Sequence, residues 1–171
     1  MAGPTASVLF RTAMTKRMAS MVEAFVREVA SDVVGDDFWV TNLTALGGLG
    51  TCDPRPFIVD RCLPSCPTMD PDDDEFQSLG TVLGFVPQSR VSFAAMSNQS
   101  VDHEILGRLC SRLARSVNGI IDLHGRLVLA EQVDGLFQVP FPSVSGVALY
   151  HYCTSDFMDW WLMQERFRLI K

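Results

Sequence analysis

The sequence predicts an α+β fold, in which residues 1–171 form a single domain with a mostly antiparallel sheet of five to seven strands and three helices. One observation is an amphipathic segment at residues 102–117, whose apolar residues recur at the spacing of one helix face. A second is a series of short apolar runs, rich in β-branched and aromatic residues, separated by turn signals. The third is the composition, 47% hydrophobic and 20% charged, which is typical of a folded globular chain.

Three segments have the pattern of a helix docked on a sheet. In the clearest, Ser100 or Asp102 can cap the start, and Asn118-Gly119 ends it because both residues tolerate a left-handed C-cap. The first helix is expected to begin after Thr12 or Thr15 and to run to about residue 30. The last is expected over residues 157–164, capped by the polar residues 154–156.

The strands are expected where apolar runs lie between turns. The expected ranges are 7–10, 38–40, 56–60, 81–86, 90–96, 120–123 and 146–153. The turn at 87–89 would make 81–96 a hairpin. Residues 130–143 are expected to be irregular because Pro140 and Pro142 cannot donate to a strand ladder. Residues 60–78, with several prolines, two cysteines and an acidic run, are expected to form a solvated loop within the domain.

Charge and hydropathy exclude two classes of partner. The net charge is −6, and residues 1–75 carry 12 acidic against 6 basic residues, so the positive field that nucleic-acid binding needs is missing. No run of 18 apolar residues is present, so no membrane span is expected. No signal peptide is recognisable, which predicts a cytoplasmic location. The five cysteines, an odd number, are then expected to be free thiols.

No cofactor and no metal are expected. The glycines at 47, 48 and 50 have neither the dinucleotide-binding nor the phosphate-loop spacing, and no helix start follows them. Three histidines and five cysteines could supply ligands, but they lack the paired spacings that mark zinc sites.

One set of residues could support nucleophilic catalysis. Cys153 and His151 alternate on one predicted strand and therefore share a face, while Asp122 and His124 do so on another. A thiolate nucleophile needs a neighbouring imidazole, which this arrangement could provide. The alternative is that Cys153 is a small core residue before a helix cap and His151 a surface residue.

Other residues are candidates for contact with a protein partner. Arg108, Arg112 and Arg115 form a row on the polar side of the central helix, either as a solvated face or as a docking surface for acidic groups. Trp160 and Trp161 point about 100° apart on a helix, so at least one should be buried, and an exposed one would be a binding candidate.

Three pieces of the sequence resemble a family of small uncharacterised bacterial α+β proteins. They are residues 37–40 (DFWV), residues 119–125 (GIIDLHG), and a last helix and tail containing Trp161, Leu162, Phe167, Arg168 and Lys171. The resemblance adds Arg168 to the partner-binding candidates but implies no established activity. By analogy alone, the size and α+β make-up are similar to those of immunity proteins that neutralise secreted toxins. The Cys- and Asp-rich insert at 60–75 departs from the pattern.

The leading hypothesis is therefore a cytosolic, non-catalytic binding protein, immunity-like by analogy alone, that occludes a protein partner. The alternative is a small hydrolase that uses Cys153 and His151. An exposed apolar or acidic patch would favour binding, whereas a concave pocket containing both residues would favour the hydrolase.

Overall fold

The computed structural model describes residues 3–62, 74–127, 129, 133–143, 146–165 and 167–169. Within these residues, eight strands form one antiparallel sheet in the order β2-β3-β4-β5-β1-β6-β8-β7. The strands are β1 (Thr5–Phe10), β2 (Asp32–Val34), β3 (Asp37–Asn42), β4 (Thr51–Cys62), β5 (Ser89–Ala95), β6 (Ile120–Asp122), β7 (Leu136–Ser143) and β8 (Gly146–Cys153). The helices are α1 (Lys16–Val29), α2 (Asp74–Leu83), α3 (Ser100–Val117) and α4 (Ser155–Leu162), with a short 3₁₀ helix η1 (Thr44–Leu46). The α+β class is confirmed, but the predicted counts of strands and helices were too low.

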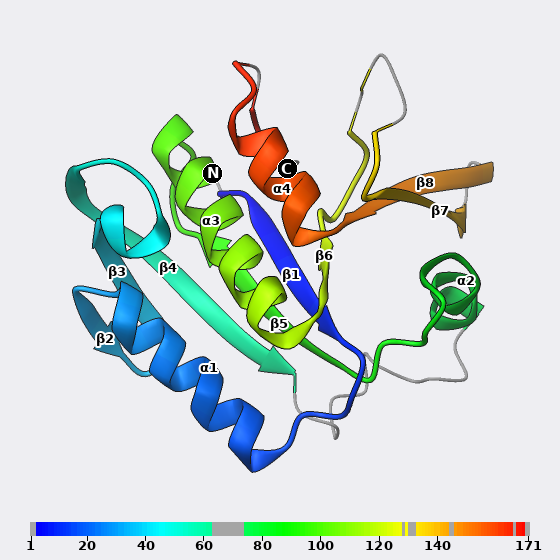
Figure 1. Ribbon diagram of the computed structural model, residues 1–171, viewed down its shortest axis with the longest axis horizontal. Coiled ribbons are helices and arrows are strands. Elements are labelled where there is room, and N and C mark those ends of the chain that lie inside the picture. Colours follow the sequence, from blue (N-terminus) through cyan, green and yellow to red (C-terminus); the bar gives the residue numbers. More distant parts are fainter. Residues whose placement is uncertain are drawn as a thin grey trace.

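The helices divide between the two faces of the sheet. Helices α1, α3 and α4 lie on one face of the sheet, here called the first face. The main core lies between these helices and the sheet, which contributes strand side chains such as Val8, Phe57 and Phe93. Helix α2 lies apart from them, beside β7 (Figure 1). Its Leu79 packs with Leu9 and other residues of a smaller core on the opposite, second face. The β2–β5 half of the second face has no helix over it among the described residues.

Helix α3 is the central element of the first face, and its C-terminal end follows from the sequence. The predicted cap at Ser100 or Asp102 is wrong, because Gln99 is the N-cap and Asp102 is the third helical residue, whose side chain accepts a hydrogen bond from the Gln99 backbone N–H at 2.7 Å. Asn118 ends the helix with a φ of 50°, as predicted. Gly119 follows because a Cβ there would lie 2.7 Å from the Leu9 carbonyl oxygen. The chain can therefore pass from α3 directly into β6 beside β1.

Three predicted segments are wrong or need revision. Residues 81–83, predicted as the start of a strand, belong to α2, because Leu79 and Leu83 repeat at helical spacing and reach the smaller core. Residues 136–143, predicted as irregular, form β7, which tolerates its prolines because it is an edge strand. The predicted loop 60–78 is wrong at both ends, since β4 extends to Cys62 and α2 begins at Asp74; residues 63–73 lie outside the described residues.

Candidate functional site

The predicted nucleophile Cys153 lies in the main core. Its side chain is fully buried, and this burial, with Cys110 and Asp122 nearby, raises the pKa of the thiol well above its ordinary value. His151 is also buried, its Nδ1 accepts a hydrogen bond from the Leu127 N–H at 3.1 Å, and burial lowers its pKa. A reactive cysteine needs an accessible thiolate with a lowered pKa. The surroundings of Cys153 are the opposite, and they favour the alternative of a small core residue. The other half of that alternative, a surface position for His151, is wrong, because His151 is 1% exposed.

The other predicted pair, Asp122 and His124, does come together, on the second face. The His124 backbone N–H donates to Asp122 Oδ1 at 2.8 Å, and the ring Nε2 lies 3.9 Å from Asp122 Oδ2. The same Nε2 lies 2.6 Å from the Ser7 hydroxyl, which is itself 2.7 Å from the Ser92 hydroxyl. Burial raises the pKa of Asp122, although the charges of His124 and Arg90 and the hydrogen bond from the His124 N–H act in the opposite direction.

Strand register explains this cluster. Ser7 on β1 lies directly opposite Ser92 on β5 and opposite Asp122 on β6, so the three side chains share one row of the second face. Sequence reasoning missed Ser7 and Ser92. The signal that could have found them is alternation, since both serines occupy the positions of β1 and β5 that point away from the main core.

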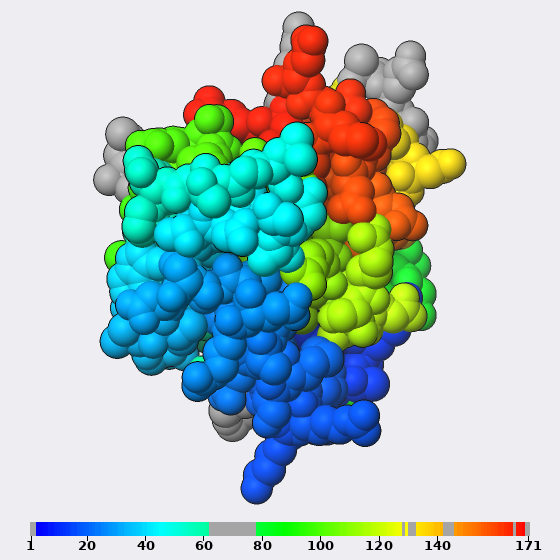
Figure 2. All heavy atoms as spheres, turned by 60° about the vertical axis from the view of Figure 1, so that its left-hand side comes forward, coloured from blue at the N-terminus to red at the C-terminus, as the bar shows by residue number. Residues whose placement is uncertain are grey.

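The predicted arginine row lines a groove on the helical side of the molecule. Residues from η1, α3 and α4 enclose about 490 Å³, including Arg108, Arg112 and Arg115. Figure 2 shows this face, where the cyan turn with η1, the yellow-green end of α3 and the orange α4 meet. The arginines extend from one side of α3 across this groove.

Each arginine of the groove already has intramolecular partners. Arg108 binds Glu104 and the Gly47 carbonyl, and Arg112 binds Glu28 and the Ala45 carbonyl. Arg115 binds two carboxylates, Asp156 at 2.9 Å and Asp159 at 2.7 Å. Three guanidinium groups thus face four carboxylates, so the groove does not offer the excess positive charge that an acidic partner would require.

The two tryptophans have different surroundings. Trp161 is 8% exposed, its Nε1 donates to the Arg168 carbonyl at 3.3 Å, and its ring meets Phe167 edge-on. Trp160 is only partly buried; its ring stacks on Trp161 and is tilted against Phe157. The prediction that at least one is buried is confirmed for Trp161. Arg168 is exposed at the surface.

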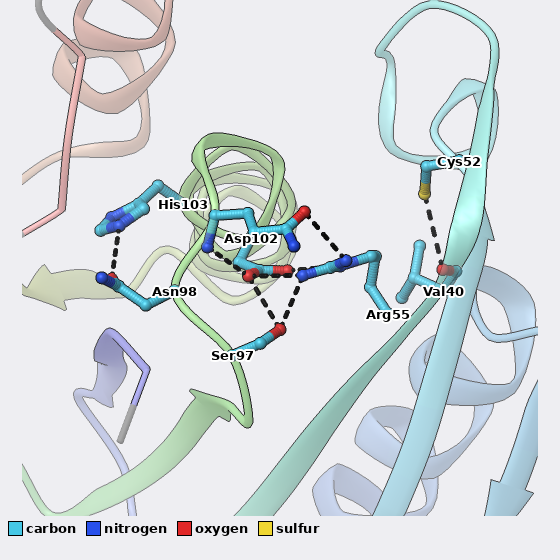
Figure 3. Close-up of polar contacts among 8 residues, drawn as sticks. Val40, Cys52, Arg55, Ser97, Asn98, Asp102 and His103 are labelled. Carbon is cyan, nitrogen blue, oxygen red and sulfur yellow. Dashed lines mark hydrogen bonds and ion pairs between the residues drawn. The ribbon is translucent and has the colours of Figure 1, made fainter. Parts of the chain in front are cut away.

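A buried ion pair that the sequence did not reveal joins β4 to α3. Arg55 donates to both carboxylate oxygens of Asp102, at 2.7 and 2.8 Å, and also to Ser97 and Gln99 (Figure 3). Asp102 is 1% exposed. Nearby, His103 lies 3.0 Å from Asn98 and accepts a hydrogen bond from the Leu169 N–H at its Nδ1. These contacts fix the start of α3 and the C-terminal segment, which makes them structural.

The second face also carries an exposed apolar area, here called the sheet-face patch. It consists of Val34, Trp39, Pro56, Ile58 and Met96. Val34, Met96 and Ile58 are 61%, 53% and 37% exposed, and Trp39 and Pro56 are partly exposed. Trp39 lies opposite Pro56, and Met96 donates its N–H to the Pro56 carbonyl.

Carboxylates lie in and around this patch. Asp37 lies between Val34 and Ile58 in one cross-strand row. Asp32 lies opposite Trp39 at the β2 edge, and Asp60 follows Ile58 on the same face of β4; both are exposed. The patch is therefore apolar with one carboxylate, Asp37, within it and two more, Asp32 and Asp60, at its margin.

Two kinds of site are not found among the described residues. No group of three His, Cys, Asp or Glu side chains there is placed to hold a metal ion. None of the helices in those ranges has the length and apolar character needed to cross a membrane.

The comparisons with known proteins identify a family for this chain but assign it no function. No curated protein and no solved structure matches the chain. A family model described as "Family of unknown function (DUF6368)" matches residues 2–171, which confirms the resemblance to an uncharacterised family. Because this match covers nearly the whole sequence, the chain belongs to the family of unknown function DUF6368.

Proposed function

We propose that this protein is a binding protein that docks its sheet-face patch on a basic surface of a protein partner and thereby occludes that surface. The observation that carries the proposal is the exposure of Val34, Ile58 and Met96 on one sheet face. Contiguous apolar surface with a polar margin is a mark of protein interaction sites. It is also the feature that distinguishes the binding hypothesis from the hydrolase hypothesis.

The composition of the patch resembles that of an interface core. Trp39 lies opposite Pro56 on β4 and diagonal to Val34 on β2, so two apolar neighbours already flank its ring. A bound partner would cover the exposed side and complete the burial of the ring. Tryptophan in such a setting is typical of a binding hot spot. We therefore expect Trp39 and Ile58 to provide most of the binding energy.

Charge favours a basic partner over a second copy of this chain. Asp32, Asp37 and Asp60 would face basic groups in the proposed complex, which speeds association and disfavours wrong partners. In a symmetric dimer through the same face, these carboxylates would meet one another. The net charge of −6 acts in the same direction.

The face, and not an edge of the sheet, is the proposed docking surface. At one edge, β7 contains Pro140 and Pro142, which lack N–H donors for another strand. At the other edge, β2 has three residues, and its Val33 N–H already donates to Asp32 Oδ1 at 2.9 Å. Neither edge is suited to strand addition, whereas no helix among the described residues covers the patch, so its side chains can be contacted.

Capture on the immobilised chain, from an extract of the cells that produce it, tests the proposal with two matched variants. Ile58→Glu places a charge in the patch, and Met163→Glu makes the same change at a residue that is 76% exposed beside the arginine-lined groove. The proposal requires a basic protein that binds wild type and Met163→Glu alike, binds Ile58→Glu at least about tenfold more weakly, and is released by salt. A partner that is lost with Met163→Glu and kept with Ile58→Glu would contradict it. The cytosolic location and the immunity-like role remain predictions.

A further inference from the structure

A chain of hydrogen bonds on the second face links two hydroxyl groups to an imidazole. Ser92 Oγ lies 2.7 Å from Ser7 Oγ, which lies 2.6 Å from His124 Nε2. The three residues come from β5, from β1 and from the turn after β6, so the fold assembles them from distant parts of the sequence. Such a chain is the arrangement needed to move a proton from a serine hydroxyl to a base.

Exposure assigns a different role to each member. Ser7 is fully buried between the other two and cannot meet a ligand. Ser92 is partly exposed, and the side chain of His124 is 35% exposed. The outer hydroxyl is therefore the one that a substrate can reach, and Ser7 is the link between that hydroxyl and the imidazole.

The backbone and the Asp122 carboxylate hold the base in place. His124 has a φ of 53°, a left-handed conformation that is uncommon for a residue other than glycine and that clusters at functional sites. Its N–H is fixed by Asp122 Oδ1, and Asp122 Oδ2 lies 3.9 Å from the ring Nε2, where it would stabilise a protonated imidazole. Arg90 is on the same strand and the same face as Ser92. Its positive charge acts to lower the pKa of Asp122 and so favours the ionised carboxylate.

We propose that Ser92, Ser7 and His124 form a proton-relay site for acyl transfer, with Ser92 as the nucleophile and small carboxylic esters as the substrate class. Ser92 Oγ forms a bond to the carbonyl carbon while its proton passes to Ser7 Oγ and the Ser7 proton passes to His124 Nε2. The carbon–oxygen bond to the leaving group then breaks, and the alcohol departs with the proton that His124 returns. Water, deprotonated through the same relay, releases the acid and restores Ser92.

This inference goes beyond the proposed binding function and does not depend on it. It also differs from the predicted hydrolase, because it uses Asp122 and His124 but replaces Cys153 and His151 with Ser92 and Ser7. The relay can be tested on the isolated full chain, without a partner. A failure here would leave the docking proposal unchanged, and a failure of docking would leave the relay unchanged.

An alkyl fluorophosphonate, which bonds to an activated serine oxygen as fluoride leaves, tests the nucleophile directly. Intact mass and peptide mapping of the folded protein should show one adduct, on the peptide containing Ser92. Ser92→Ala should lose the adduct, whereas Ser116→Ala, a helix serine bonded to the Leu113 carbonyl, should label like wild type. An adduct elsewhere, or no adduct on folded wild type, would overturn the proposal.

The rate of labelling tests the relay separately from the nucleophile. His124→Gln and Ser7→Ala should each slow labelling of Ser92 by about 10²-fold or more, because general-base catalysis contributes about 10²–10⁴-fold. Hydrolysis of p-nitrophenyl acetate should fall in parallel. Circular dichroism melts identify which variants are folded, and Ser7→Thr, which keeps a hydroxyl, should retain more labelling than Ser7→Ala. Equal labelling rates in wild type and a folded His124→Gln variant would overturn the relay.

Discussion

Arg55 and Asp102 connect the longest strand to the first turn of the central helix through two parallel hydrogen bonds, 2.7 and 2.8 Å long. Both side chains are largely removed from solvent, at 12% and 1% exposure. Asp102 also accepts from Ser97 at 2.9 Å and from the Gln99 N–H. One carboxylate thus completes the helix cap and satisfies a buried guanidinium.

Asp102→Ala should therefore be severely destabilising. Removal of the carboxylate leaves the Arg55 charge with only the neutral Ser97 and Gln99 side chains as hydrogen-bond partners, and breaking a buried ion pair in this way typically costs about 3–5 kcal/mol. Glu23→Ala is the matched control, because Glu23 pairs with Arg61 at 2.6 Å but is 53% exposed; that change should cost less than about 1 kcal/mol. Urea unfolding of the two variants measures the loss in free energy of unfolding for each. Similar losses would show that the buried ion pair contributes no more to stability than the exposed one.

The same residue should contribute to acid unfolding. Burial by itself raises the pKa of Asp102, but the hydrogen bonds from Arg55, Gln99 and Ser97 outweigh it and lower the pKa below its ordinary value. The stabilisation is therefore present above the unfolded-state pKa of about 3.9 and is lost as the pH falls through the lower folded-state pKa. The stability difference between wild type and Asp102→Asn should shrink as the pH drops below about 4. A difference that stays constant from pH 7 to pH 3 would refute this assignment.

The two adjacent tryptophans should respond differently to substitution. Trp161→Ala removes a buried ring that packs on Phe167 and should cost about 3–5 kcal/mol. Trp160 is only partly buried, so Trp160→Ala should cost clearly less. Removal of residues 160–171 should unfold the protein. Thermal melts of the three variants decide this, and a truncated chain that melts like the full chain would show that the segment is an appendage.

The core cysteines should be protected from alkylation in the native state. Cys110 and Cys153 are fully buried, and burial raises the pKa of both thiols. Iodoacetamide should therefore modify them only after unfolding, as followed by peptide mass mapping with and without urea. Cys52, which is partly exposed, provides the internal comparison. Fast modification of Cys153 in the folded chain would contradict its assignment as an unreactive core residue and would support it as a nucleophile.

Local patterns were enough to predict the fold class and most of the first face. The α3 segment combined an apolar stripe with a recognisable C-cap, and both features depend only on residues close in sequence. The wrong predictions concern segments whose secondary structure depends on where the strand lies in the sheet. Pro140 and Pro142 were interpreted as strand breakers, but they are tolerated because β7 turned out to lie at the edge.

The site residues were harder to predict because strand order is a non-local property. Asp122 and His124 were singled out from their alternation, and the structure does place them in contact. Their partners, Ser7 and Ser92, lie 117 and 32 residues before His124 in the sequence and meet it only because β1 lies between β5 and β6. The sheet-face patch was missed for a related reason: exposure of Ile58 depends on which face the helices cover.

The central claim, docking through the sheet-face patch, is tested most directly by site-specific photo-cross-linking. A photoreactive phenylalanine analogue would replace Val34, Ile58 or, as a control, Met163, all of which are exposed. We expect positions 34 and 58 to cross-link one basic protein in the producing cells, and position 163 not to do so. Cross-links to that partner from position 163 alone, or cross-links from position 58 only to a second copy of this chain, would contradict it.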